Sequence, residues 1–343
     1  MSARLPRRGK AALAPLALLL TLAALGWAVL RGLMPAAVAG PPARLLIATN
    51  TEYLGACPVM AAQSQGFFVQ QGLAVQVLPF SSGKAALNAV LAGEAQVATA
   101  ADIAIMFAAL ERQPIRILST IYRVEHDHGV VARRDAGIQA PADLKGKRIG
   151  VTMQTSGHFT LDAYLNRQRL AANEVELVNY KPDQLLPALV NHEVDAVAGW
   201  DPFLQAITAQ LGANALRFSA QDVYESIYNL VTTEGYLQQH KGQMVQMLLA
   251  LRDGEQFCRQ YPMQASAFLG RLTQGRRDAM LQSWPDNHFA LELDQDLLLA
   301  LEDQARWALK SQFSARRELP NFLDYVYLDG LAAVRPAGVT IIH

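Results

Sequence analysis

Short apolar runs alternate along this chain with segments whose apolar residues recur at helical spacing. The runs at Leu45–Thr49 and Leu73–Leu78 flank a helical pattern from about Pro58 to Gly66. Proline suits the first turn of a helix, and glycine suits its end. The pattern therefore predicts a βαβ unit with buried parallel strands.

The same alternation continues toward the C-terminus. Further strands are predicted at Ala95–Ala100, Ile115–Ile121, Val130–Ala132, Arg148–Val151, Glu174–Tyr180 and Asp195–Ala198. Helices are predicted over Lys84–Leu91, after Asp102, after Gly157 and over Asp183–Asn191, and the spacing from Glu234 to Leu309 is mostly helical. We therefore predict an α/β protein of two lobes with a helical C-terminal tail. Ligand loops are expected at the carboxyl ends of the strands.

Composition agrees with a folded chain of about two domains, since 51% of the 343 residues are hydrophobic and only 17% are charged. The 30 basic residues are balanced by 30 acidic ones, which argues against a nucleic-acid partner. Five of the basic residues precede residue 41, where no acidic residue occurs. The body of the chain is therefore mildly acidic.

The N-terminus has the layout of a membrane-directing segment. Four basic residues precede an uncharged stretch over residues 11–30, as in a secretory signal. Twenty apolar residues are also enough to cross a bilayer. Ala37-Val38-Ala39 offers a cleavage site, so residues 1–40 are expected to be a signal peptide or a membrane anchor. Both alternatives place the body in the periplasm, soluble or tethered to the inner membrane by this helix.

Cys57 and Cys258 are the only cysteines, 201 positions apart. We expect two unpaired, partly buried thiols, because a free cysteine behaves as a small core hydrophobe. A disulfide is the alternative, since an exported chain enters an oxidising compartment and sequence does not give the distance between the two Cα atoms. Leu54-Gly55-Ala56-Cys57 looks like a lipid-attachment box but lies too far beyond the apolar run.

Several short motifs then stand in a familiar order. They are Gly66-Phe67-Phe68 with Gly72-Leu73 and Val75, Leu91-Ala92-Gly93-Glu94-Ala95, Asp143-Leu144-Lys145-Gly146-Lys147-Arg148-Ile149-Gly150-Val151, Asp195-Ala196 and Trp200-Asp201-Pro202. With these motifs the chain resembles the periplasmic substrate-binding proteins of the nitrate, sulfonate and taurine type, whose relatives include thiamine-precursor-binding proteins. The resemblance spans roughly Leu45 to Tyr236.

This resemblance implies the type II periplasmic binding protein fold, in which two lobes close on a ligand by a hinge. The chain would cross twice between the lobes. One lobe would combine residues 44–126 with 224–343, and the other would comprise residues 127–223.

The predicted binding residues follow strands or begin helices. Free backbone N–H groups and hydroxyls at a helix start can hold an anion, although helix capping alone also explains each Ser, Thr or Asp. From the first lobe we select Asn50, Glu52, Tyr53, Ser81, Ser82, Gly83, Ala101 and Asp102. From the second lobe we select Thr155, Ser156, Gly157, His158, Trp200 and Asp201.

Aromatic and histidine residues leave alternatives open. Trp200 is expected to stack on the ligand or to belong to the core, with Asp201 capping the next helix, and Tyr53 and Tyr228 could equally cover a sheet edge. His126 and His128 have the spacing of zinc ligands, but a solvated hinge strand explains them better. No metal, cofactor or catalytic residue is therefore predicted.

Together these features predict the solute-binding component of an ABC importer, with a small organic ligand and an inner-membrane permease as partners. The ligand class is a sulfonate, a taurine-like zwitterion, nitrate or a thiamine precursor. An enzyme on the same fold and a membrane-anchored orphan sensor are the alternatives. Because the loops carry Glu52, Asp102 and Asp201, and because Lys84 is expected to point away, we expect zwitterions or amines to bind better than simple anions.

Overall fold

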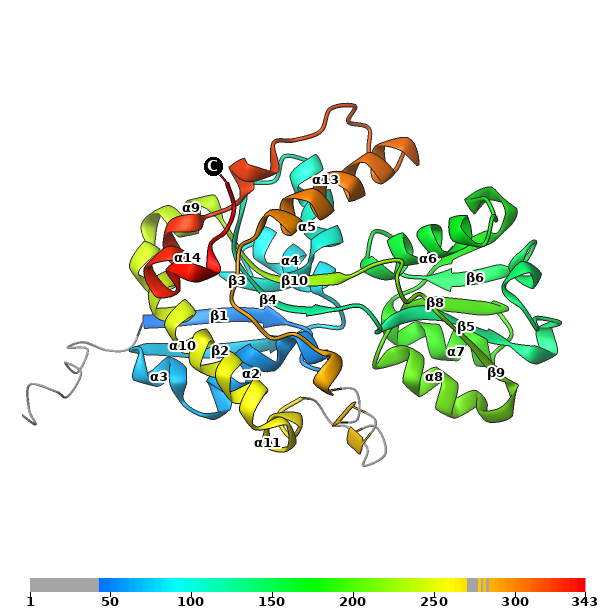
Figure 1. Cartoon of the computed structure of the whole chain (residues 1–343), viewed down its shortest axis with the longest axis horizontal. Coiled ribbons are helices and arrows are strands. Elements are labelled where there is room, and N and C mark those ends of the chain that lie inside the picture. The colour runs from blue at the N-terminus through cyan, green and yellow to red at the C-terminus, as the bar shows by residue number, and fades with distance from the viewer. Residues whose placement is uncertain (1–42, 270–276, 279, 282–283, 343) are drawn as a thin grey trace, which may run out of the picture. The chain divides into compact units, whose positions relative to one another are not determined.

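The computed structural model describes residues 43–269, 277–278, 280–281 and 284–342, so the predicted signal or anchor over residues 1–40 lies outside the described residues. Residues from Pro42 onward form one compact unit. Two five-stranded mixed sheets organise this unit (Figure 1). The α/β class predicted from the alternating pattern is confirmed.

The first sheet has the strand order β2-β1-β3-β10-β4. β1 runs parallel to β2 and β3, which confirms the predicted βαβ unit, whereas β10 is antiparallel to β3 and β4. Its strands are β1 (Ala43–Thr49), β2 (Leu73–Pro79), β3 (Val97–Ala101), β4 (Ile115–Val124) and β10 (Ser226–Thr233).

The second sheet has the order β7-β6-β8-β5-β9, with β6 parallel to β7 and β8, and β5 antiparallel to β8 and β9. Its strands are β5 (His128–Arg133), β6 (Arg148–Val151), β7 (Glu176–Asn179), β8 (Ala196–Trp200) and β9 (Ala215–Ser219). The chain enters this sheet between Val124 and His128 and leaves it between Ser219 and Ser226. We call these two segments the first and second crossings.

Helices cover both faces of each sheet (Figure 1). The first sheet is accompanied by α2 (Cys57–Ser64), α3 (Phe67–Gln70), α4 (Gly83–Leu91), α5 (Asp102–Leu110), α9 (Glu234–Gln239), α10 (Lys241–Gln260), α11 (Pro262–Ser266), α13 (Gln295–Lys310) and α14 (Leu328–Val334). The second sheet is accompanied by α6 (Ser156–Arg167), α7 (Leu185–Val190) and α8 (Phe203–Leu211).

Side-chain alternation along β5 shows how the second sheet is buried. Val130 and Ala132 join the core formed with α6, whereas Val131 joins the core formed with α7 and α8. A strand covered on both faces needs apolar residues at successive positions. This explains why the sequence reads as a continuous apolar run.

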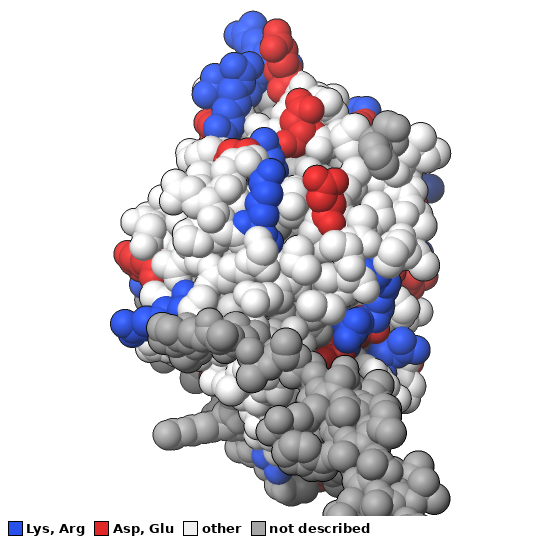
Figure 2. All heavy atoms as spheres, turned by 90° about the vertical axis from the view of Figure 1, so that its left-hand side faces the viewer, with Lys and Arg blue, Asp and Glu red and all other residues white. Residues whose placement is uncertain are grey.

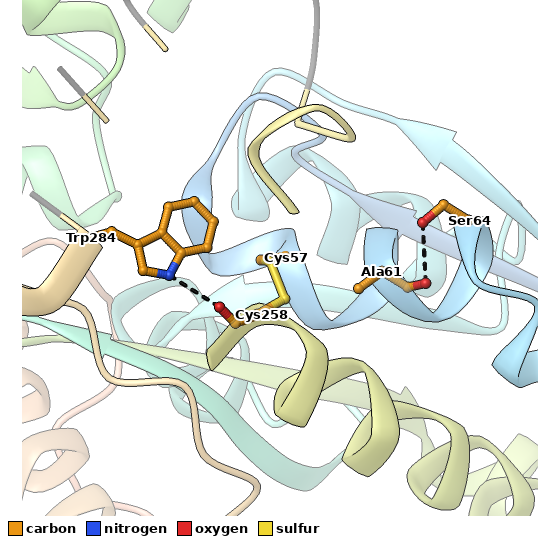
Figure 3. The surroundings of a disulfide bond; sticks show 5 residues. All are labelled: Cys57, Ala61, Ser64, Cys258 and Trp284. Carbon is orange, nitrogen blue, oxygen red and sulfur yellow. Dashed lines mark hydrogen bonds between the residues drawn. A yellow bond between two sulfur atoms is a disulfide. The ribbon is translucent and has the colours of Figure 1, made fainter. Parts of the chain in front are cut away.

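The prediction of two unpaired thiols is wrong, because Cys57 and Cys258 form a disulfide with Cα atoms 6.2 Å apart (Figure 3). α10 packs along α2. A Cβ atom at Gly254 would lie 2.2 Å from the Pro58 carbonyl oxygen, so only glycine permits this approach of the two helices. The Trp284 indole N–H also donates to the Cys258 carbonyl oxygen, at 3.1 Å.

Surface charge is sparse and mixed. On the face drawn in Figure 2, acidic and basic side chains are interspersed among uncharged ones. Within the described ranges, no helix has the length and apolarity needed to span a membrane.

Candidate functional site

Residues from both sheets line a small cavity that we call the serine chamber. Its volume is about 20 Å³, which admits only a small chemical group. The first sheet and its helices supply Asn50, Tyr53, Ser82, Gly83, Lys84, Ala101, Ala104, Ser226 and Tyr228, and the second supplies Thr155, Ser156 and Trp200. Eight of the fourteen residues selected from the sequence line this chamber: Asn50, Tyr53, Ser82, Gly83, Ala101, Thr155, Ser156 and Trp200.

One wall of the serine chamber is the start of α4. The Ser82 hydroxyl caps this helix by accepting a hydrogen bond of 3.2 Å from the Ala85 N–H group. A Cβ atom at Gly83 would lie 2.8 Å from the Ala100 Cα atom, so this helix start can approach β3 only with glycine there. The first N–H groups of α4 therefore lie at the chamber, where they favour a negative charge.

The start of α6 forms the opposing wall. Thr155 occupies the N-cap position but its side chain caps no N–H group; its hydroxyl donates to the Thr152 carbonyl oxygen instead, at 2.7 Å. The first N–H groups of α6 thus have no side-chain cap from Thr155. Two helix N-termini face one chamber, and their partial positive charges add.

Lys84 lines this chamber, contrary to the expectation that its side chain points away. Its ammonium group donates to the Met153 carbonyl oxygen and to Gln154 Oε1, both at 3.0 Å. Burial lowers the pKa of Lys84. The contact joins α4 to the loop before α6.

A second cavity, of about 80 Å³, shares Tyr53 with the first, and we call it the carboxylate chamber. Its lining combines the apolar surfaces of Tyr53, Leu54, Tyr122, Val124, Pro202 and Met280 with Glu52, His126, Asp127, Asp201, Gln205, Asp286 and Asn287. Four carboxylates therefore line this chamber, and the described residues that line it include no Lys or Arg.

The four carboxylates differ in their partners. Asp201 receives two hydrogen bonds from the Arg217 guanidinium group, at 3.1 and 3.0 Å. Burial raises the pKa of Asp201, and Arg217 opposes that rise. Asp127 accepts from the Tyr53 hydroxyl at 2.8 Å and contacts His128 Nδ1 at 2.6 Å. Glu52 and Asp286 form no ion pair within the described part of the chain.

Four of the selected residues line neither chamber. Ser81 is exposed, and Gly157 and His158 are buried in the first turn of α6. Asp102 is fully buried and accepts hydrogen bonds from Tyr224, Gln304 and the Ile103 N–H group. The charge argument from the sequence therefore needs correction, because Asp102 does not face the cavity and Lys84 does.

Sequence reasoning missed several lining residues. Tyr122 and Ser226 lie within buried strands, where nothing in the apolar pattern distinguishes a cavity-lining position from a core position. Asp127 was interpreted as part of a solvated hinge, yet its exposed fraction is only 8%. Its position between two expected strands was the one available signal.

Known proteins resemble this chain in sequence and in fold. The sequence profile described as NMT1/THI5 like matches residues 55–265. The chain belongs to the NMT1/THI5-like family. A taurine-binding periplasmic protein of Escherichia coli is 26% identical over 151 residues, which cover 44% of this chain and 47% of the relative. The chain thus spans about half the length of this curated relative.

Solved structures show the same fold in alkanesulfonate-binding proteins. SsuA from Xanthomonas axonopodis, bound to MOPS, superposes with a TM-score of 0.73 at 19% identity, covering 84% of this chain and 99% of that one. SsuA from Escherichia coli gives 0.68 at 17% identity, covering 83% and 98%. This likeness identifies the periplasmic binding protein fold for this member of the NMT1/THI5-like family.

Proposed function

We propose that this chain is the periplasmic solute-binding component of an ABC importer and that it captures a small organosulfonate between two lobes. The lobes would comprise residues 44–126 with 224–343 and residues 127–223, joined at the two crossings. The observation that carries this proposal is the serine chamber, which the N-termini of α4 and α6 line together with Lys84, whose ammonium group binds the loop before α6. The relatives' printed names, for taurine and alkanesulfonate binding, agree with it.

The carboxylate chamber favours an amine at the other end of the ligand. Glu52 and Asp286 are exposed at this chamber and form no ion pair within the described ranges. An ammonium group bound there would lie close to the negative carboxylates of Glu52 and Asp286, while the sulfonate would occupy the serine chamber. A short aminosulfonate therefore suits both chambers better than nitrate or a simple alkanesulfonate.

Calorimetric titration tests both parts of the proposal. We expect taurine to bind more tightly than ethanesulfonate, and both to bind more tightly than nitrate or an aminopyrimidine. Tighter binding of ethanesulfonate or nitrate would refute the zwitterion preference. Absence of binding by both sulfonates would refute the organosulfonate function, and recovery of a chemically altered ligand would assign the chain to an enzyme class.

Variants connect the affinity to named groups. Lys84→Met should weaken both sulfonates by roughly tenfold or more, since it removes a partly desolvated charge. Lys145→Met is the matched control, because Lys145 is exposed and pairs with Glu174 away from the chambers. Glu52→Gln with Asp286→Asn should lower the affinity for taurine and leave that for ethanesulfonate unchanged.

A further inference from the structure

Trp307, near the C-terminal end of α13, contacts α6, the helix whose start lines the serine chamber. The Trp307 indole N–H donates a hydrogen bond of 3.0 Å to Asp162 Oδ2 on α6. α13 itself packs on α5, beside the first sheet, whereas α6 packs on β8 and β5 of the second. Trp307 therefore joins helices that belong to different sheets.

Aromatic packing reinforces this single hydrogen bond. The Trp307 ring makes edge contacts with Phe159 and His158 of α6, at centroid distances of 5.1 and 5.3 Å. Phe313, just beyond α13, contacts the His158 ring at 4.7 Å. On the side of the first sheet, Trp307 also meets Phe107 of α5 at 6.0 Å. The indole is thus held between α5 and α6.

Two polar atoms in this contact oppose it. Asp162 Oδ1 and His158 Nε2 are both buried, and neither has a hydrogen-bond partner among the described residues. A buried polar atom without a partner raises the free energy of the closed contact, because it can form hydrogen bonds to water only when the contact opens. Aromatic packing therefore favours the contact while these two atoms favour its separation, as expected of a contact that opens and closes.

The contact bears directly on the serine chamber. Thr155 and Ser156 line that chamber and lie at the start of α6, within two turns of Asp162. On the opposite side, Gln304 lies one turn before Trp307 on α13 and donates to the buried Asp102 carboxylate. α13 is therefore held to α5, beside the first sheet. Contacts from α13 to α6 consequently influence the position of the α6 residues that line the chamber.

We propose that Trp307 is a positioning residue that clasps α6 to α13, holds Thr155 and Ser156 against the serine chamber, and so slows the release of bound ligand. The effect on release rests on the proposed function. The clasp itself, formed by Trp307 and Phe313 with His158, Phe159 and Asp162, does not depend on which ligand binds.

The clasp is tested first without ligand. Spin labels at the exposed positions Glu94, before β3, and Asn173, before β7, report the separation of the two sheets. We expect Trp307→Ala to shift the distance distribution of the ligand-free protein from that of the wild type toward longer values. Identical distributions in folded wild-type and variant protein would overturn the proposal.

Stopped-flow measurement of taurine and ethanesulfonate release tests the second part. Trp307→Phe keeps an aromatic ring but loses the N–H donor, and we expect release roughly tenfold faster with little change in the association rate. Asp162→Ala should have the same effect, and the double variant should add little to either single one. Unchanged release in both single variants, or full additivity, would overturn the proposed role.

Tyr325→Phe is the matched control. Its hydroxyl donates to the Ala109 carbonyl oxygen at 3.1 Å, a bond that joins the C-terminal segment to α5 and not to α6. We expect this variant to release ligand at the wild-type rate. If the wild type binds neither sulfonate, the proposed function fails, and the ligand-free distances still decide the clasp.

Discussion

The Tyr53 hydroxyl donates a hydrogen bond of 2.8 Å to Asp127 Oδ2. This bond ties the loop after β1 to the first crossing, and the same hydroxyl lies 3.3 Å from Ser226 Oγ, where the second crossing ends. Burial raises the pKa of Tyr53 well above its ordinary value, so the phenol remains a donor. Since Tyr53 also lines both chambers, one side chain connects the cavity walls to both crossings.

Replacing Tyr53 by phenylalanine should therefore affect stability while keeping the ring in the cavity wall. Asp127 would lose a donor to its buried carboxylate, and we expect the free energy of unfolding to fall by about 1.5–3 kcal/mol. Urea unfolding monitored by circular dichroism measures this. Tyr261→Phe is the control because Tyr261 is 46% exposed, and its unfolding free energy should stay unchanged. Equal stability of Tyr53→Phe and wild type would contradict the coupling.

The disulfide between Cys57 and Cys258 should make a large contribution to stability. It closes a loop with a sequence separation of 201, so reduction returns much conformational entropy to the unfolded chain. We expect reduction to lower the free energy of unfolding by about 2–5 kcal/mol. A Cys57→Ala, Cys258→Ala variant should show the lower stability both with and without reductant. If reductant does not change the midpoint of wild-type unfolding, this prediction is contradicted.

The sequence predicted best those elements whose partners lie nearby in the chain. β1, α2 and β2 were predicted within a few residues because a βαβ unit is specified by local periodicity. β10 was not predicted as a strand. It pairs with β3 and β4, more than a hundred residues earlier, and its buried Asn229 and Thr232 interrupt the apolar pattern.

The site shows the same dependence on distance along the chain. Ser82 and Ser156 were selected from helix-start signals that are local, and both line the serine chamber. Lys84 was misjudged because its partners Met153 and Gln154 lie about seventy residues away. The prediction of two unpaired cysteines was wrong for the same reason, since only the packing of α10 on α2 brings the two sulfur atoms together.

Gly83 provides a test of the close approach between α4 and β3. Alanine there would place a Cβ atom 2.8 Å from the Ala100 Cα atom, and backbone cannot move aside cheaply. We expect Gly83→Ala to lower the unfolding free energy by about 1–3 kcal/mol and to weaken taurine binding. Gly235, in α9, has no heavy atom within 4 Å of such a Cβ atom. Gly235→Ala should therefore raise stability by up to about 1 kcal/mol, as measured by thermal and urea unfolding.

Stability between pH 4 and 6 should reflect two buried groups that act in opposite directions. Burial raises the pKa of Asp102 from its ordinary 3.8 to about 6, and hydrogen bonds from Tyr224 and Gln304 limit the rise. Between these values the native state holds a proton that the unfolded state has released. The contribution of Asp102 to stability is therefore fully present below pH 3.8 and is lost as the pH rises through 6.

His158 acts in the other direction. Burial, with a smaller effect of Lys84, lowers its pKa from 6.5 to about 4. Between these values the unfolded state binds a proton that the native state does not, so stability is lost as the pH falls from 6.5 toward 4. The two contributions partly cancel in the wild type, so together they should change its unfolding free energy little over this interval.

Asp102→Asn separates the two contributions, because asparagine keeps the shape and does not titrate. With the opposing Asp102 contribution removed, the His158 contribution should make the unfolding free energy of the variant fall as the pH is lowered from 7 to 4. The difference between wild type and variant should grow in favour of the wild type by an amount on the order of 3 kcal/mol. Urea titrations at half-unit pH steps measure both curves. Parallel curves would mean that Asp102 titrates near its ordinary pKa, and the assignment of a raised pKa would then be wrong.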